Sequence, residues 1–216
     1  MRIAIDGPAG SGKSTIARML SERLGIPYLN TGMVYRLFAY IAMTKGTTHV
    51  DSLFNEKIQV RVDVGKTEVF WEGVKLEEEL RTEEVGQWAS LLAQDPTFRK
   101  AINQLFWSII GSSQMVVEGR DASTHIIPDA DLKIFITASP EERARRRYIQ
   151  LMEQGLKVDY HEVLKNLLER DERDARRKVA PLKPTEGALI IDTTGKTPEE
   201  VLQEILHLVA SKERGY

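Results

Sequence analysis

The sequence contains no cysteine, which excludes a disulfide framework, a cysteine-based zinc site and a cysteine nucleophile. It also lacks any apolar run approaching the ~18 residues of a membrane-spanning helix. The apolar stretch at its N-terminus is too short for the core of a signal peptide. From these absences we expect a cytoplasmic protein with no membrane partner. No repeat, low-complexity tract or linker divides the 216 residues, so one domain over residues 1–216 is predicted.

Charge of either sign is nearly balanced, with 30 Lys and Arg against 32 Asp and Glu and a formal net charge of -2. Proteins that bind nucleic acid are usually basic, so no nucleic-acid partner is expected. The 4 histidines share no metal-ligand spacing and are interpreted as structural or surface residues. A monomer is expected.

Short apolar segments alternate with amphipathic ones along most of the chain. The segments that resemble buried strands are 2–6, 27–29, 115–118, 132–137 and 188–192, and helical spacing is found in 13–24, 33–44, 82–92 and 96–110 and after 139 and 197. This alternation predicts an α/β fold with a doubly wound parallel sheet, whose ligands bind at the carboxyl ends of the strands.

A different pattern interrupts this alternation at residues 57–76. Here Ile58, Val60 and Val62 alternate with polar residues, and two further short strands follow the Gly65-Lys66 turn. We therefore predict a small antiparallel insert over about residues 47–81.

The segment Gly7–Ser14 matches the phosphate-loop pattern GxxxxGK[ST] without a gap. Its glycines allow backbone N–H groups to converge on an anion at the start of the following helix. Lys13 is then expected to reach the β- and γ-phosphates, and the Ser14 hydroxyl to ligate Mg²⁺. The motif lies between a predicted strand and a predicted helix, which is the context it requires.

The phosphate loop alone leaves the enzyme class open. No Asn-Lys-x-Asp motif for guanine is present, which argues against a GTPase. The strand 115–118 ends in Glu118, which either orients the water shell of Mg²⁺ or bonds to the loop around Gly119. The remaining classes are a small-molecule kinase and an ATP-dependent switch protein.

Arginines gather at three places where phosphate groups are expected. Arg143, Arg145, Arg146 and Arg147 crowd the start of one helix, Arg170, Arg173 and Arg177 are predicted to share one face of another beside Asp174, and Arg36 and Arg120 each follow a predicted strand. Transfer between two nucleotides brings two anionic groups together and needs charge neutralisation more than a general base. The pattern therefore favours a kinase whose acceptor is itself a phosphate.

Several blocks of the sequence resemble the bacterial cytidylate (CMP/dCMP) kinases, which are P-loop nucleoside monophosphate kinases. The blocks are IAIDGPAGSGKST at the start, LNTGMVYR at 29–36, GRD at 119–121, PDADLKIFITASPEERARRR at 128–147, ERDERDARR at 169–177, APL at 180–182 and IDTTG at 191–195. They follow the family's order and include the antiparallel insert in the acceptor-binding region. The resemblance implies transfer of the γ-phosphoryl group of ATP to CMP or dCMP, with Mg²⁺.

The resemblance also implies roles for individual residues. The ATP phosphates would be bound by Gly7, Pro8, Ala9, Gly10, Ser11, Gly12, Lys13, Ser14 and Thr15. The acceptor would be bound by Thr31, Arg36, Arg120 and Arg177 at its phosphate, Ser90, Arg99 and Asp121 at cytosine, and Arg170 and Asp174 at the ribose. Lys13, Arg120, Arg147 and Arg177 would be catalytic, and residues 147–168 would form a mobile lid.

Two departures from the family pattern lie near the acceptor site. The chain has Asn30 where the family commonly has Asp, and Ala122-Ser123 where Met-Gly usually follows GRD. Two rival functions remain at this point. One is a kinase of UMP or of an alcohol, for which Asp121 is the candidate base, and the other is a non-catalytic ATP-dependent switch.

Overall fold

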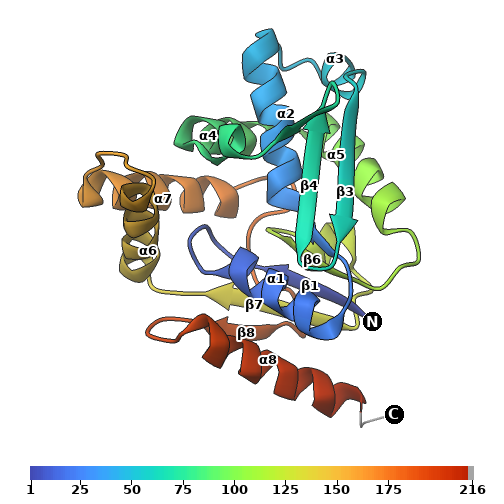
Figure 1. Ribbon diagram of the computed structural model, residues 1–216, viewed down its shortest axis with the longest axis vertical. Helices are drawn as coiled ribbons and strands as arrows, with labels where there is room; N and C mark the ends of the chain where they lie inside the picture. The colour runs from blue at the N-terminus through green and yellow to red at the C-terminus, as the bar shows by residue number, and fades with distance from the viewer. Residues whose placement is uncertain (214–216) are drawn as a thin grey trace.

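Residues 1–213 are described by a computed structural model (Figure 1). Its strands are β1 (Arg2–Asp6), β2 (Tyr28–Asn30), β3 (Ile58–Asp63), β4 (Lys66–Trp71), β5 (Val74–Leu76), β6 (Met115–Gly119), β7 (Leu132–Thr137) and β8 (Leu189–Asp192). Its helices are α1 (Lys13–Leu24), α2 (Thr31–Lys45), α3 (Val50–Phe54), α4 (Glu83–Leu92), α5 (Pro96–Ile110), α6 (Pro140–Glu153), α7 (Tyr160–Ala175) and α8 (Pro198–Glu213). The short helical turns η1 (Glu78–Arg81) and η2 (Ala122–Ile126) complete the order.

Five parallel strands form the central sheet in the order β2-β6-β1-β7-β8. The middle strand β1 pairs with β6 so that Ile5 lies opposite Glu118 and Asp6 opposite Gly119. Because every strand runs the same way, the carboxyl ends meet at one edge of the sheet. The predicted doubly wound parallel sheet is confirmed.

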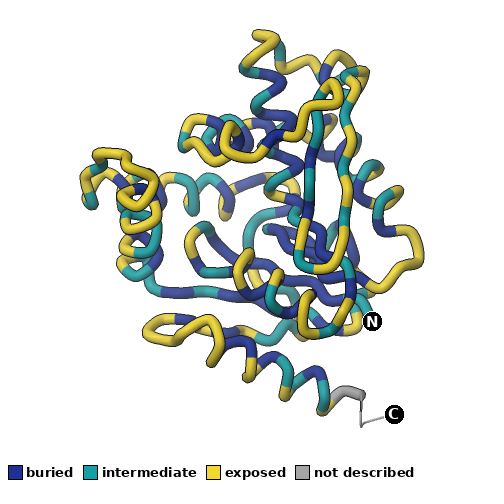
Figure 2. The backbone as a smooth tube through the Cα atoms, viewed as in Figure 1, coloured by how far each residue is buried: buried dark blue, intermediate teal, exposed yellow. Residues whose placement is uncertain are grey.

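The two faces of this sheet are buried against different helices. Ile3 and Ile5 belong to a core shared with residues of α1 and α8, whereas Ala4 belongs to a larger core shared with α2, α4 and α5. Figure 2 shows the central strands as the continuous buried layer, and α6 and α7 as much more exposed. Because alternate residues of β1 face these two cores, the strand is apolar from Ile3 to Ile5. No helix within residues 1–213 is both long and apolar enough to cross a membrane.

The predicted insert is a three-stranded antiparallel sheet in the order β3-β4-β5. Its central strand starts at Lys66, directly after a turn in which Gly65 adopts a φ of +71°. The Thr67 hydroxyl joins the insert to the main sheet, because its Oγ1 accepts from Asn30 N at 2.8 Å and donates to Tyr28 O at 2.7 Å. Sequence periodicity did not predict the short elements α3 and η1, which are too brief to repeat a pattern.

The start of α2 and the end of α7 differ from the sequence prediction. Helix α2 begins at Thr31 because the Asn30 side chain accepts a hydrogen bond from Met33 N at 3.0 Å. Helix α7 ends at Ala175, so the predicted helical face shared by Arg170, Arg173 and Arg177 is wrong for Arg177.

An aromatic cluster holds α2, α3 and α5 together. Phe98 is fully buried, and its ring lies 5.6 Å from the centroids of Phe38 and Phe54 and 5.7 Å from that of Tyr35. We predict that Phe98→Ala lowers the free energy of unfolding by about 3–5 kcal/mol, because the cavity cannot close between rigid helices. Urea denaturation would measure the change. Leu91→Ala, at a half-exposed position on α4, serves as the control. A loss at Phe98 no larger than the control's would contradict the assignment.

Candidate functional site

The phosphate loop has a backbone conformation that only glycine tolerates at its first position. Gly7 has a φ of +149°, and an added Cβ would lie 1.9 Å from the carbonyl oxygen of Ile136 on the neighbouring strand β7. Gly10 and Gly12 also have positive φ, 73° and 90°. The loop therefore packs directly on the sheet edge and leads into α1, as the motif predicts.

Lys13 is buried inside this loop. Its Nζ donates to Pro8 O at 2.7 Å. Burial, and next the positive charge of Arg120, hold the pKa of Lys13 well below its ordinary value. Glu118 acts in the opposite direction. Burial and neighbouring positive charge thus disfavour the charged form of Lys13, which an incoming anion would stabilise.

Glu118 lies on the other side of the loop, where its carboxylate accepts two hydroxyl donors. Ser14 Oγ donates to Oε1 at 2.8 Å, and Tyr28 OH donates to Oε2 at 2.5 Å. Among the side chains of residues 1–211 this buried carboxylate has no Lys or Arg nitrogen at ion-pair distance. A negative charge beside a serine hydroxyl fits a divalent cation bound with a nucleotide. Of the two roles predicted for Glu118, the geometry favours the one at the metal.

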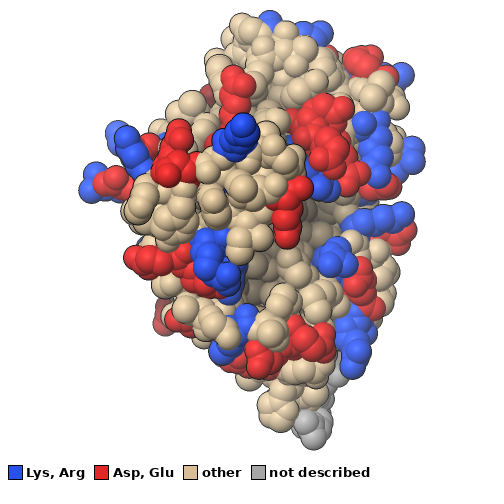
Figure 3. Space-filling model, turned by 60° about the vertical axis from the view of Figure 1, so that its left-hand side comes forward, with Lys and Arg blue, Asp and Glu red and all other residues tan. Residues whose placement is uncertain are grey.

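The loop forms one wall of a cleft of about 510 Å³. Figure 3 shows a hollowed face of the molecule with basic groups around it. The basic side chains that line this cleft come from six helices, turns and loops, and are Lys13, Arg36, Arg81, Arg120, Arg146, Arg147 and Arg170. The cleft is therefore built to receive more than one anionic group.

The arginines in this cleft perturb one another. Arg36 Nη1 donates to Leu80 O at 2.7 Å and to Thr82 O at 3.0 Å. Burial, followed by the charges of Arg170 and Arg147, lowers the pKa of Arg36 to about 9. Burial and the charge of Arg120 lower the pKa of Arg170 to about 10. Positive charge here is incompletely compensated by the protein itself.

Asp174 is the carboxylate on which the acceptor-side residues converge. Its Oδ2 lies 3.4 Å from Arg120 Nε and 4.0 Å from Arg170 Nε, and its Oδ1 lies 3.9 Å from Arg177 Nη2 and accepts from Ser90 Oγ at 3.2 Å. Burial acts to raise the pKa of Asp174, but the three arginines outweigh it and the pKa is lowered. Residues predicted from three separate blocks are thus brought together.

A second buried ion pair joins Arg99 on α5 to Asp121. Arg99 Nη2 donates to Asp121 Oδ2, and both side chains are about 95% or more buried. The Nε of Arg99 and the hydroxyl of Tyr35 are buried and have no hydrogen-bond partner in the part of the chain that the structure describes. Polar atoms left unpaired in this way are expected where a polar ligand completes the set.

Arg145 and Arg146 of α6 both pair with Glu142, whereas Arg143 does not. Arg145 forms an exposed pair with Glu142. Arg143 Nη1 donates to Ala9 O at 3.1 Å and pairs with Asp171 at 2.6 Å, so it anchors the phosphate loop to α6 and α7. The third, Arg146, reaches the loop after β8.

Thr31 does not face the cleft. Its Oγ1 donates to Glu118 O at 2.7 Å, which ties the start of α2 to the end of β6. Its neighbours Asn30, Gly32 and Met33 line the cleft instead. The position is close to the predicted acceptor site, but the hydroxyl is already engaged with the backbone.

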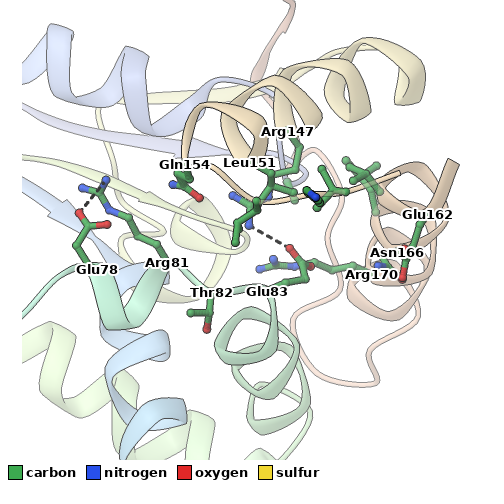
Figure 4. Close-up of a pocket in the computed structure, with 17 residues that line it drawn as sticks. Glu78, Arg81, Thr82, Glu83, Arg147, Leu151, Gln154, Glu162, Asn166 and Arg170 are labelled. Atoms are coloured by element: carbon green, nitrogen blue, oxygen red, sulfur yellow. Dashed lines mark hydrogen bonds and ion pairs between the residues drawn. The ribbon is translucent and has the colours of Figure 1, made fainter. Parts of the chain in front are cut away.

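A second cleft of about 600 Å³ separates α6 and α7 from η1 and the start of α4. Figure 4 shows Arg147 and Arg170 reaching into it from one side and Glu83 from the other. Arg147 Nη2 pairs with Glu83 Oε2 at 3.0 Å across this space. Residues 147–168, the predicted lid, are thus joined to α4 by the ion pair between Arg147 and Glu83, and open volume lies beside this pair.

Sequence reasoning missed two polar groups at the sheet edge. Asp6 accepts hydrogen bonds from Ala122 N at 2.7 Å and from Ser123 N and Oγ at 2.8 and 2.6 Å, so it holds the loop after β6 in place. The sequence pattern places Tyr28 only within the predicted strand 27–29. The position of Asp6 at a strand end was the available signal for the first, whereas nothing in the spacing linked Tyr28 to Glu118.

Comparisons with known proteins agree on one family. The model of the cytidylate kinase family matches residues 3–211. The cytidylate kinase of Aquifex aeolicus (strain VF5) is 54% identical, with 99% of this chain and 98% of that protein covered. The cytidylate kinase of Thermosipho africanus (strain TCF52B) is 41% identical over 98% and 95%. A gluconokinase structure from Sinorhizobium meliloti 1021 covers 100% of this chain and 95% of its own, with 18% identity and a TM-score of 0.50, and so shares the fold.

The excess of positive charge predicts that simple oxyanions stabilise the protein. Sulfate should raise the melting temperature in proportion to the logarithm of its concentration, because binding to the folded state alone shifts the unfolding equilibrium. Arg36→Met should reduce this shift, whereas Arg18→Met, in an exposed pair on α1, should not. Differential scanning calorimetry against sodium chloride of equal ionic strength measures the effect. Equal shifts in both salts would contradict an anion site.

Proposed function

This chain belongs to the cytidylate kinase family, and we propose that its arginine-lined cleft transfers the γ-phosphoryl group of ATP to CMP or dCMP, giving ADP and CDP or dCDP. The observation that carries the proposal is the convergence at one sheet edge of a phosphate loop with two buried Arg–carboxylate groups. The phosphate loop suits a nucleoside triphosphate. The two Arg–carboxylate groups suit a nucleotide whose base and sugar both need hydrogen-bond partners.

ATP would be bound by its phosphates along Gly7–Thr15. The loop N–H groups and the start of α1 offer donors to the phosphate oxygens, and Lys13 would contact the transferring group. Ser14 and Glu118 supply the oxygen ligands that suit Mg²⁺, so they would hold the ion bound with ATP. Bound there, Mg²⁺ would neutralise charge on the β- and γ-phosphates.

Arginine side chains would hold the acceptor phosphate in line with ATP. Arg36 and Arg120 line the cleft, and Arg147 reaches into it from α6. Arg177 is buried and pairs with Asp174, which also pairs with Arg120. Thr31 contributes at most through the position of α2, because its hydroxyl is engaged by Glu118 O. Positioning and charge stabilisation supply most of the catalysis in such reactions.

The nucleoside would be read by the two buried carboxylates. Asp121 with Arg99 and Ser90 would contact cytosine, since a carboxylate accepts from its N4 amino group and repels the carbonyl of uracil. Asp174 with Arg170 would contact the sugar. The support for this assignment is that Arg99 donates to the buried Asp121, while Ser90 donates to the buried Asp174 and Arg170 pairs with it.

A phosphate acceptor needs no general base, because its second pKa near 6 leaves it mostly dianionic at neutral pH. Closure of residues 147–168 over the phosphates would exclude water and limit ATP hydrolysis. The insert over about residues 47–81 would support the acceptor side.

An acceptor panel tests the proposed function directly. ADP release from ATP is measured with no acceptor, with each nucleoside monophosphate and with hydroxyl compounds such as shikimate. CMP and dCMP should give the fastest turnover. Equal hydrolysis without an acceptor would indicate a switch protein, and preference for UMP or an alcohol would indicate another kinase. The predicted monomer is checked by light scattering, and the predicted cytoplasmic location by cell fractionation.

Lys13→Ala should lower kcat by about 10²–10³-fold, because it removes one charged donor from the transferring phosphoryl group. CMP affinity should change little, since Lys13 is assigned to ATP. Steady-state kinetics and calorimetric titration with CMP measure the two quantities. The control is Lys100→Ala, at an exposed position on α5. A tenfold loss of CMP affinity with intact turnover would contradict the assignment.

Asp121→Asn should shift the preference from CMP toward UMP by about 1–3 kcal/mol in kcat/KM, because the amide can donate to the uracil carbonyl. The variant also weakens a buried ion pair, so its melting temperature is measured first. Asp129→Asn, in an exposed pair with Arg2, is the matched control. Turnover that collapses equally for both nucleotides would indicate a general base instead.

A further inference from the structure

The carboxylate of Glu118 is held between two hydroxyl groups that come from different elements. Ser14 on α1 donates to Oε1, and Tyr28 on β2 donates to Oε2. Both Glu118 and Tyr28 are about 95% buried, and Glu118 has no ion-pair partner among the side chains of residues 1–211. A glutamate side chain that turned by one rotamer would move its charge away from Ser14. The contact with Tyr28 opposes this rotation.

Asn30 determines where the Tyr28 proton points. The Asn30 side chain caps α2, because Oδ1 accepts from Met33 N at 3.0 Å, and this fixes Nδ2 as the group that donates to Tyr28 OH at 3.1 Å. The phenol oxygen therefore accepts a hydrogen bond from Asn30 Nδ2 and donates one to Glu118 Oε2. An aspartate at position 30 would instead accept from Tyr28 and compete with Glu118.

We propose that Tyr28 is a positioning residue for the metal-facing carboxylate, in that its hydroxyl holds Glu118 with Oε1 turned toward Ser14 and the cation of the bound nucleotide. Asn30 supports it by orienting the phenol. This inference rests on the ATP and Mg²⁺ site of the proposed function. The proposal also gives a role to Asn30, which stands where the family commonly has Asp, because Tyr28 needs an amide donor at this position and not a second carboxylate.

A purely structural role for Tyr28 predicts something different. The ring packs in the core shared by α1 and the sheet, and phenylalanine would fill the same volume. If only the ring matters, Tyr28→Phe leaves metal binding unchanged. If the hydroxyl orients Glu118, metal binding weakens while the fold is retained.

The test is the affinity for Mn²⁺, measured by electron paramagnetic resonance with a non-hydrolysable ATP analogue bound to the full chain. Tyr28→Phe should weaken Mn²⁺ binding by roughly 10-fold, as for other groups that orient metal ligands. Affinity for the metal-free analogue and the KM for CMP should stay within twofold of wild type. Tyr40→Phe is the matched control, because Tyr40 lies on α2 against Trp71, away from the phosphate loop.

A double-mutant cycle with Glu118→Gln separates the two roles of Tyr28. Tyr28→Phe should have no further effect on Mn²⁺ affinity in the Glu118→Gln background, because its effect passes through the carboxylate. An equal loss in both backgrounds, or wild-type Mn²⁺ affinity in Tyr28→Phe, would overturn the proposal.

A second variant covers the case in which Tyr28→Phe does not fold. Asn30→Ser keeps a residue that caps helices well but removes the amide donor, so it should weaken Mn²⁺ binding in the same direction. Unchanged Mn²⁺ affinity in that variant would also contradict the proposal. A wild-type protein that binds Mn²⁺ with the analogue yet does not phosphorylate CMP would overturn the proposed function, while the comparison at Tyr28 still decides the inference.

Discussion

Parallel pairing of β1 with β6 places Ile5 against Glu118 and Asp6 against Gly119, so the phosphate loop and the loop after β6 leave the sheet side by side. Asp6 then closes the edge by accepting from the backbone N–H groups of Ala122 and Ser123. Donor and acceptor sites therefore share one rigid boundary. A shift of this register by one residue would move Glu118 and the loop after β6 relative to the phosphate loop.

The cationic cleft has an electrostatic cost that the protein offsets only in part. Asp174 neutralises the arginines behind the cleft, but Arg36 and Arg170 still show lowered pKa values because burial and neighbouring arginines disfavour their charge. Phosphate groups would relieve this repulsion when they bind. The same charges become most useful when negative charge accumulates between donor and acceptor, which is how such a site favours the transition state.

Local patterns in the sequence predicted the parts of the fold that depend on short-range physics. The phosphate loop, the apolar strands and the helices over 96–110 and after 139 are all predicted from neighbouring residues, and the structure confirms these elements. The acceptor residues came from the family resemblance. The structure groups most of them around Asp121 and Asp174, whereas Thr31 contacts Glu118 O and Arg36 contacts Leu80 O and Thr82 O. What could not be predicted depends on long-range contacts. Examples are the anchoring role of Arg143, the end of α7 before Arg177, and the hydroxyl network at Glu118.

The end of β6 shows why these long-range contacts matter for chemistry. Glu118 shares with Val116 the face of the strand that packs against α1, which turns its carboxylate toward Ser14. Asp121 lies beyond the strand end and turns toward α5, where Arg99 meets it, while Arg120 between them faces the cleft. Three charged residues within four positions thus contact three different surroundings. Their separation by the pleat and by the turn at Gly119 keeps the three side chains from pairing with one another, as the proposed roles at the metal, the transferring phosphoryl group and the base would require.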